Sequence, residues 1–557
     1  MTNTLKIALA QLNPTLGKIE ANLNLIRIAR SKAQDSDLVV SGELMVSGYP
    51  PEDLVLKPSF LDAIEQQVRV FACETSDGGP AVLLGTPWRE NGNLYNAALL
   101  LMEGRIEAAC YKRELPNYGV FDEKRVFCAG SDLHPMEFRG VRLGVMICED
   151  MWGERVSMGL AAAGADLFVV LNGSPFDVKK KIARFDYASA RTKESELDLV
   201  YVNLIGGQDE LVFDGDSFVM GNGGVLIQRA CSWQDSVLET SWKLIKNKWR
   251  CQNQNQLTQV GKIEEIYRAI TLGLRDYVNK NGFPGVLIGL SGGIDSALSA
   301  AVAVDAIGPD RVHCVMMPSP YTSQQSIDDA VEIANLLGCR LDTISIEPAM
   351  AAFGEMLKSS FENETADTTE ENVQSRSRGL SLMALSNKFG YMVLSTGNKS
   401  EMSVGYATLY GDMCGGYSVL KDIYKTTVFT LSEWRNANVP VDALGPAGPV
   451  MGARVISKPP SAELKPDQKD EDSLPPYEKL DDILFGLIED ELSAAEIAAT
   501  GHDPETVDNV WRMLDRAEYK RRQAPPGVKI SSRSFGRDRR YPITNGFTGY
   551  KSQGNEL

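Results

Sequence analysis

Two patterns of apolar residues alternate along most of this chain. Short apolar runs, which predict buried strands, are separated by amphipathic stretches with apolar residues three or four positions apart, which predict helices. In the first half, the apolar runs begin at residues 6, 37, 81, 96, 142, 166, 199 and 216. The pattern predicts an α/β fold in which helices cover layered sheets.

The second half repeats the alternation in a more regular form. A helix is expected over residues 263–278 and another from about Ser323 to a stop at Gly338. Strands are expected at 286–290, 312–319, 341–347 and 391–395. Regular alternation of this kind predicts a doubly wound, mostly parallel, Rossmann-like sheet.

Between the halves, residues 241–262 lose the strand pattern and become basic and then rich in Asn and Gln. We therefore expect one domain at 1–245, a linker at 246–262 and a second domain at 263–557. A chain of 557 residues is too long for one core, which agrees with two domains.

The composition of the chain limits the functions and the catalytic groups to be expected. The net charge of -17 argues against a broad nucleic-acid surface, which needs a positive groove. The nine cysteines include no C-x-x-C pair, and the chain shows neither a basic leader nor an apolar run of transmembrane length, so we expect a cytoplasmic protein with reduced thiols and no membrane contact. Only three histidines are present, so proton transfer is expected to fall to carboxylates and lysines.

One strand-turn-helix stretch, VLIGLSGGIDS at residues 286–296, predicts a phosphate cradle. Its two glycines let backbone N–H groups approach an anion, and a helix is expected to begin at Ala297. No lysine follows the glycines, which excludes a P-loop. The stretch resembles the loop of ATP pyrophosphatases, and the resemblance implies that ATP is cleaved between its α- and β-phosphates.

Three residues in the first half stand out at the ends of predicted strands, namely Glu43, Cys148 and Ser174, and Lys112 lies in a segment between them. Glu43, Lys112 and Cys148 are each unremarkable alone, but their order and contexts resemble the nitrilase superfamily. The resemblance implies an α-β-β-α sandwich in which these residues are catalytic. The chemistry is coherent, because a cysteine needs a base to take its proton and a nearby lysine stabilises an oxyanion.

Glutamine-using members of that superfamily suggest the substrate contacts. The positions that match are Tyr118, Ser174 and Lys180. Lys180 is selected from the run Lys179 to Lys181 only by its spacing from Ser174, and a solvated lysine run is the competing interpretation.

The second half closely resembles NAD synthetases. The resemblance rests on SGGIDS, EENVQSRSRG, STGNKSE, the loop Gly411 to Gly416 and the segment from Pro459 to Tyr477. With the nitrilase-like half in front, the whole chain resembles the glutamine-dependent members of that family. This implies Mg²⁺, ATP, deamido-NAD and glutamine as ligands and a homo-oligomer. The Pro- and Asp-rich segment 457–476 predicts a long loop, which we expect to form a lid over substrate.

The resemblance also assigns residues in the second half. It implies ATP binding by Gly289, Leu290, Ser291, Gly292, Gly293, Ile294, Asp295, Ser296 and Thr396. It implies deamido-NAD binding by Asn372, Glu401 and Lys520, and metal binding by Asp295 and Glu401.

Two other interpretations stay open at this point. Adenylation could serve another acceptor, as in other amidotransferases or in tRNA thiolation, although the negative charge disfavours RNA. The chain could also be an amidase whose second half is a regulatory nucleotide-binding module. ATP cleavage to AMP would discriminate the last interpretation from the other two.

Overall fold

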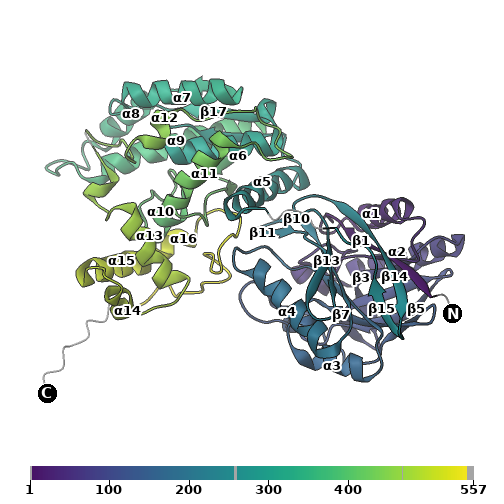
Figure 1. The fold of residues 1–557 in the computed structure, drawn as a ribbon. Coiled ribbons are helices and arrows are strands. Elements are labelled where there is room, and N and C mark those ends of the chain that lie inside the picture. The colour runs from purple at the N-terminus through teal and green to yellow at the C-terminus, as the bar shows by residue number, and fades with distance from the viewer. Residues whose placement is uncertain (1–2, 256–259, 467, 548–557) are drawn as a thin grey trace, which may run out of the picture. The chain divides into compact units, whose positions relative to one another are not determined.

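The computed structural model describes residues 3–255, 260–466 and 468–547. The chain forms two compact units, Met1–Val260 and Gly261–Leu557 (Figure 1). No helix in these described ranges is long and apolar enough to cross a membrane.

The first unit is built on two large sheets. One has the strand order β15 (Lys248–Cys251), β14 (Ser236–Ile245), β1 (Thr4–Gln11), β2 (Leu38–Val40), β3 (Ala81–Glu90), β4 (Asn93–Met102), β5 (Arg105–Tyr111). The other has the order β13 (Val225–Arg229), β12 (Phe218–Gly221), β9 (Leu199–Asn203), β8 (Leu167–Asn172), β7 (Val141–Ile147), β6 (Met136–Phe138). A separate ribbon joins β10 (Ile205–Gln208) and β11 (Leu211–Asp214).

Alternating side chains divide these strands between three cores. Ile7 and Leu9 of β1 pack with Val145 and Val169 of the other sheet, so the two sheets face each other. Ala8 points the opposite way, into a core with α1 (Ile19–Lys32) and α2 (Pro58–Glu74). The helices α3 (Glu154–Ala162) and α4 (Lys180–Ser195) cover the far side of the second sheet (Figure 1). The predicted α-β-β-α sandwich is confirmed.

Short 3₁₀ turns in this unit follow or connect the strands. They are η1 (Glu52–Leu56), η2 (Thr75–Asp77), η3 (Glu123–Arg125) and η4 (Cys148–Met151).

The second unit contains a five-stranded, all-parallel sheet. Its order is β18 (Arg340–Thr343), β17 (Val312–Met316), β16 (Val286–Gly289), β19 (Met392–Ser395), β20 (Tyr417–Ser418). The chain leaves β16 toward β17 and later returns on its other side as β19, so strand order reverses at β16. This confirms the doubly wound sheet and places its switch point, where such folds bind ligands, beside the end of β16.

Helices surround this sheet and continue beyond it. The first six are α5 (Lys262–Lys280), α6 (Ile294–Ile307), α7 (Gln324–Leu337), α8 (Glu347–Leu357), α9 (Thr368–Phe389) and α10 (Lys399–Val404). The others are α11 (Lys425–Ala437), α12 (Ala453–Ser457), α13 (Tyr477–Ile488), α14 (Ala494–Ala499), α15 (Pro504–Arg516) and α16 (Glu518–Arg521), with 3₁₀ turns η5 (Pro309–Arg311) and η6 (Asp470–Asp472). A second core joins α10, α13, α14 and α15.

Two local expectations need correction. Residues 241–251 do not lose strand structure, because β14 continues to Ile245 and pairs with β15, so part of the expected linker lies in the first sheet. Residues 256–259 of that linker lie outside the described residues. The helix after the glycine turn begins at Ile294 rather than Ala297, since Gly293 already serves as its N-cap.

Candidate active sites

A buried lysine joins two carboxylates in the first unit. Lys112 follows β5, and its Nζ lies 2.7 Å from Glu43 Oε1 and 2.7 Å from Glu123 Oε1. All three residues are buried. Opposite charges hold the Lys112 ammonium in its protonated form and raise its pKa against the effect of burial, which lowers it. Burial raises the pKa of Glu123 to about 7.

Glu43 is fixed in position by neutral donors as well. Its Oε2 accepts from the backbone N–H of Gly173 at 2.8 Å, and its Oε1 accepts from Asn96 Nδ2 at 2.8 Å. The ends of β2, β5 and β8 and a residue within β4 therefore meet at one carboxylate. A rigidly held carboxylate of this kind suits proton transfer at a fixed distance.

Cys148 stands directly after β7 with a left-handed backbone, φ 47°. Three backbone N–H groups, from Arg113, Glu114 and Ile147, donate to the Asp150 carboxylate and hold this turn in place. Burial, followed by the Glu43 carboxylate, raises the pKa of the Cys148 thiol. A thiol in this environment needs a base to become a nucleophile.

The predicted glutamine contacts lie around the same turn. Tyr118 Oη donates to Glu149, which follows Cys148 in the chain, at 2.9 Å. Lys180 Nζ lies 4.7 Å from the centre of the Phe121 ring and 5.5 Å from that of Trp152. Burial lowers the pKa of Lys180 to about 8.

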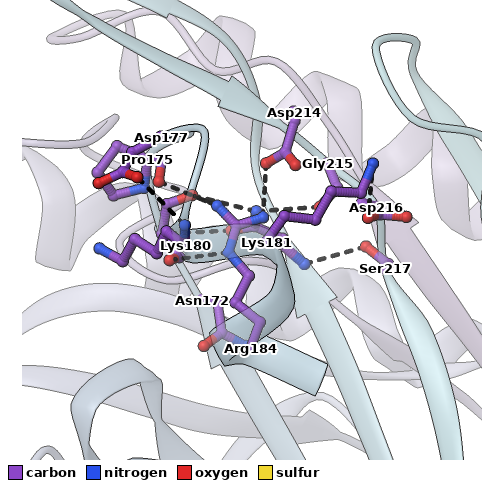
Figure 2. A network of polar contacts seen from close by, with 12 residues as sticks. Asn172, Pro175, Asp177, Lys180, Lys181, Arg184, Asp214, Gly215, Asp216 and Ser217 are labelled. Carbon is purple, nitrogen blue, oxygen red and sulfur yellow. Dashed lines mark hydrogen bonds and ion pairs between the residues drawn. The ribbon is translucent and has the colours of Figure 1, made fainter. Parts of the chain in front are cut away.

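The side chains of Lys180 and Lys181, neighbours in the lysine run 179–181, point in different directions (Figure 2). Lys179 is exposed, and Lys181 turns to Asp216 at 3.5 Å. Lys180, at the start of α4, points away from that pair (Figure 2). Ser174 is joined to the same helix, because Arg184 of α4 donates to its carbonyl oxygen at 2.8 Å. Among the three lysines, Lys180 is thus the one beside the cysteine turn.

Sequence reasoning missed Glu123 and Glu149 as site residues. Glu123 lies in a charged run, DEKR, that reads as an exposed turn, and Glu149 lies in an acidic pair beside Cys148. Spacing alone did not distinguish them from solvated residues. For Glu149, its position next to Cys148 in the sequence was the available signal.

In the second unit, the glycine turn forms the expected cradle. Gly292 has φ 80°, and an added Cβ would lie 2.2 Å from the carbonyl oxygen of Ser326, so this position requires glycine. Ser296 Oγ accepts from the N–H of Ser291 at 3.2 Å and donates to the carbonyl oxygen of Gly293 at 2.9 Å. The turn is therefore preorganised at the N-terminus of α6.

A second lysine joins two carboxylates beside this turn. Lys425 Nζ donates to Asp295 and, at 3.1 Å, to Glu401 Oε1. Asn398 Nδ2 donates to the other oxygen of Asp295 at 2.9 Å. Burial raises the pKa of Glu401 to about 7. In the described part of the chain, no group of three or more His, Cys, Asp or Glu side chains is arranged to hold a metal ion.

Two cavities open at this point of the sheet. One of about 220 Å³ is lined by Gly289, Leu290, Ser291, Arg378, Leu382 and Thr396, among others. The other, about 180 Å³, is lined by Gly293 to Ser296, Thr396, Glu401, Lys425 and Lys458, among others. Their positions and linings suit a nucleoside and its phosphates, respectively.

The segment 457–476 borders both cavities. It has little regular structure beyond η6, as expected for the described part of this segment. Glu463 lines both cavities and accepts from Ser326 Oγ at 2.7 Å. The segment thus lies against the N-terminus of α7.

Asn372 and Lys520 meet one loop rather than either cavity. Asn372 Oδ1 accepts from Thr408 Oγ1 at 2.9 Å, and Lys520 Nζ donates to the carbonyl oxygens of Gly405 and Ala407. Arg376 donates to the carbonyl oxygen of Leu409 in the same loop. Asn372 and Arg376, four positions apart on α9, are therefore both directed at residues 405–411.

Comparisons with known proteins agree with this division. Residues 6–244 match the carbon-nitrogen hydrolase family and residues 266–524 match NAD synthase. A glutamine-dependent NAD(+) synthetase from Rhodobacter capsulatus is 46% identical, covering 98% of this chain and 99% of the relative.

Solved structures show the same likeness. The glutamine-dependent NAD+ synthetase from Acinetobacter baumannii, in complex with ADP, is 43% identical with a TM-score of 0.77, covering 98% of this chain and 100% of that one. A glutamine-dependent NAD(+) synthetase from Cytophaga hutchinsonii, 22% identical, shares the fold with a TM-score of 0.81, covering 98% of each chain. The chain therefore belongs to the family of glutamine-dependent NAD(+) synthetases.

Proposed function

We propose that the protein converts deamido-NAD to NAD, using ATP and taking nitrogen from glutamine. The products besides NAD are AMP, pyrophosphate and glutamate. The observation that carries the proposal is the presence in one chain of a buried Glu-Lys-Cys cluster and a preorganised phosphate cradle. Family membership over nearly the full chain supports the same pairing of activities.

The first unit would release ammonia from glutamine. Glu43 takes the thiol proton as Cys148 sulfur bonds to the amide carbon, and the carbonyl electrons move onto oxygen beside the Lys112 ammonium. The C–N bond then breaks, Glu43 returns the proton, and ammonia leaves a thioester. Water, deprotonated by Glu43, attacks the thioester and releases glutamate and the thiol.

The flanking residues suit the two charges of an amino acid. In this proposal, the Lys180 ammonium and the Ser174 hydroxyl receive the α-carboxylate of glutamine, and Glu149, which accepts from Tyr118, receives its α-ammonium. Complementary charges in a partly desolvated site fix orientation more strongly than surface charges do.

The second unit would activate the nicotinate carboxylate, because a carboxylate is a poor electrophile. A carboxylate oxygen of deamido-NAD bonds to the α-phosphorus of ATP, and pyrophosphate leaves with its electron pair into the cradle at 291–296. Ammonia then bonds to the acyl carbon, AMP leaves, and one proton is released. Asn372, Lys520 and Glu401 are proposed to hold deamido-NAD, and Gly289 to Ser296 with Thr396 to hold ATP.

Asp295 and Glu401 fit a Mg²⁺ ion by chemistry. They present hard carboxylate oxygens to one cavity, and each oxygen keeps a lone pair beyond its bond to Lys425 or Asn398. A bound Mg²⁺ would neutralise charge on the ATP phosphates. Lys425 would share that task from the protein side.

The proposal includes a cytoplasmic homo-oligomer assembled through the second unit. No residue of α8 is buried, and its apolar side chain Met356 is 69% exposed. In the adjacent α9, Leu380 is 65% exposed. Apolar surface of this extent favours a partner, and a second copy is the partner that the family resemblance implies. Leu380→Asp should lower the mass in light scattering, and an unchanged mass would exclude this face.

The deciding experiment measures NAD formed from deamido-NAD and Mg-ATP, with glutamine or ammonium as nitrogen source, in wild type and Cys148→Ala. We expect the variant to lose synthesis from glutamine and to keep synthesis from ammonium. If wild type makes no NAD from either source, the proposal is wrong. AMP formed in step with NAD checks the adenylation chemistry.

A further inference from the structure

A buried arginine behind the expected glutamine site has every guanidinium nitrogen bonded. Arg184 is 2% exposed and lies one helical turn after Lys180 in α4. Its Nε donates to Ser174 Oγ at 3.2 Å, and its Nη2 donates to the carbonyl oxygens of Ser174 and Pro175 at 2.8 and 3.0 Å. Its Nη1 donates to Asp214 Oδ1 at 2.7 Å (Figure 2).

We propose that Arg184, held by Asp214, is a positioning residue that sets Ser174 and Lys180 at the spacing needed for the α-carboxylate of glutamine. The proposal rests on the proposed function for the roles of Ser174 and Lys180. Arg184 itself is buried behind the site and does not touch substrate.

The contacts explain why an arginine is needed here. The guanidinium is a planar fork that can bond a hydroxyl, two carbonyl oxygens and a carboxylate at once, whereas an ammonium is a point charge. Three of the four acceptors belong to the segment that carries Ser174. The fourth, Asp214 at the end of β11, fixes the guanidinium plane from the other side.

Arg184 also determines where α4 begins relative to this segment. Residues four positions apart lie on one face of a helix, so the bonds of Arg184 to residue 174 place Lys180 beside the same segment. The Asn203 side chain already holds the backbone of Ser174. Its Oδ1 accepts from the N–H of Ser174 at 2.9 Å, and its Nδ2 donates to the carbonyl oxygen of Ser174 at 3.2 Å. Arg184 therefore contributes specifically to the position of the Ser174 hydroxyl and of the first turn of α4. The backbone after β8 is already held by Asn203.

A neighbouring charge network makes a useful contrast. Lys181 and Arg229 both pair with Asp216, and Figure 2 shows Lys181 and Asp216. Two buried arginine-aspartate pairs thus lie close together, Arg184 with Asp214 and Arg229 with Asp216. The bonds of Arg184 to Ser174 give the first pair a role at the expected glutamine site beyond that of a buried ion pair.

The test compares glutamine kinetics in three variants of the full-length enzyme. Arg184→Met with Asp214→Val removes both charges, and such replacements of a buried pair are often neutral for stability. Arg184→Lys keeps the charge and loses the fork. Arg250→Met is the matched control, since Arg250 also pairs with a buried aspartate, Asp198, at 2.7 Å.

For the double variant, we expect the KM for glutamine to rise about tenfold or more while kcat changes by about twofold or less, as for lost ground-state orientation. Arg184→Lys should give a smaller rise in the KM for glutamine, at a stability close to that of wild type. If the double variant does not fold, this single variant still tests the inference. Arg250→Met and all ammonium-driven rates should match wild type.

An unchanged KM in a folded Arg184 variant would overturn the inference, as would an equal rise in KM in Arg250→Met. Wild-type hydrolysis of glutamine, measured first, tests the proposed function separately. The ratio of variant to wild-type KM tests the positioning role alone.

Discussion

The two units contain similar clusters of charged side chains that differ in how deeply they are buried. In each, a lysine lies between two carboxylates: Lys112 between Glu43 and Glu123, and Lys425 between Asp295 and Glu401. The first set is sealed, with Glu43 and Lys112 side chains 0% exposed. In the second set, Asp295 and Glu401 keep 18% and 17% exposure and line a cavity.

The difference follows from what each site would handle. A small amide is attacked by a thiol, and excluding water strengthens every charge interaction around the sulfur. A nucleotide with its phosphates needs space and solvent-accessible oxygens. The same charge pattern therefore makes a closed reaction centre in one unit and an open binding centre in the other.

The largest expected effect is in the sealed cluster. Glu43→Gln should lower glutamine hydrolysis by about 10³-fold, because the base for Cys148 is lost. Ammonium-driven NAD synthesis should not change, since it uses the other unit. Initial rates of glutamate and NAD formation measure both, and hydrolysis within about twofold of wild type would exclude Glu43 as the base.

The open cluster should respond in the opposite way. Lys425→Met leaves Asp295 and Glu401 without their shared cation, so NAD synthesis from both nitrogen sources should fall about 10²-fold. Glutamine hydrolysis by the first unit is the internal control. Normal synthesis from ammonium in this variant would show that Lys425 is not part of the reaction centre.

A smaller effect distinguishes the two sites by pH. Burial lowers the pKa of Lys180 to about 8, so its positive charge is lost as the pH rises above that value. The KM for glutamine should then rise, up to about tenfold per pH unit, while the KM for deamido-NAD with ammonium should not follow.

Lys180→Arg provides the matched variant, because an arginine stays charged across this range. Its KM for glutamine should stay level between pH 7 and pH 9. A rise in the variant that equals the rise in wild type would assign the titration to another group, such as the glutamine α-ammonium.

A further effect concerns the stability of the fold and not a reaction rate. Burial raises the pKa of Glu123 to about 7 in the folded state, above the 4.5 of a free side chain. Between these values the folded state holds a proton that the unfolded state has lost, so stability falls as pH rises through this window, by roughly 3 kcal/mol at most.

Glu123→Gln removes this titration. The change in thermal midpoint of the first unit between pH 5 and pH 8 should therefore be smaller in the variant than in wild type, measured by calorimetry. An equal or larger change would show that another group causes the pH dependence. Glu401→Gln offers the same comparison in the second unit, because burial raises the pKa of Glu401 to about 7 as well.

Much of the fold could be predicted because its elements follow local patterns. The helix from Gln324 to Leu337 has its expected stop at Gly338, whose φ of 68° favours glycine. The prediction for residues 241–251 was wrong because β14 and β15 form an edge hairpin whose positions are mostly only partly buried, so apolar and polar residues do not alternate clearly along it.

The chain by itself determined which chemical groups are present and in what order: a strand-ending cysteine, an isolated glutamate and lysine, and a glycine turn that requires positive φ. These depend on residue type and short spacing, which a sequence carries directly. Only the tertiary structure decided that Glu123 shares Lys112 with Glu43, that Lys180 rather than Lys181 lies beside Cys148, and that Arg184 holds Ser174. Each of these depends on which strand ends meet and how deeply they are buried, and burial sets both the charge state and the partner of an ionisable group.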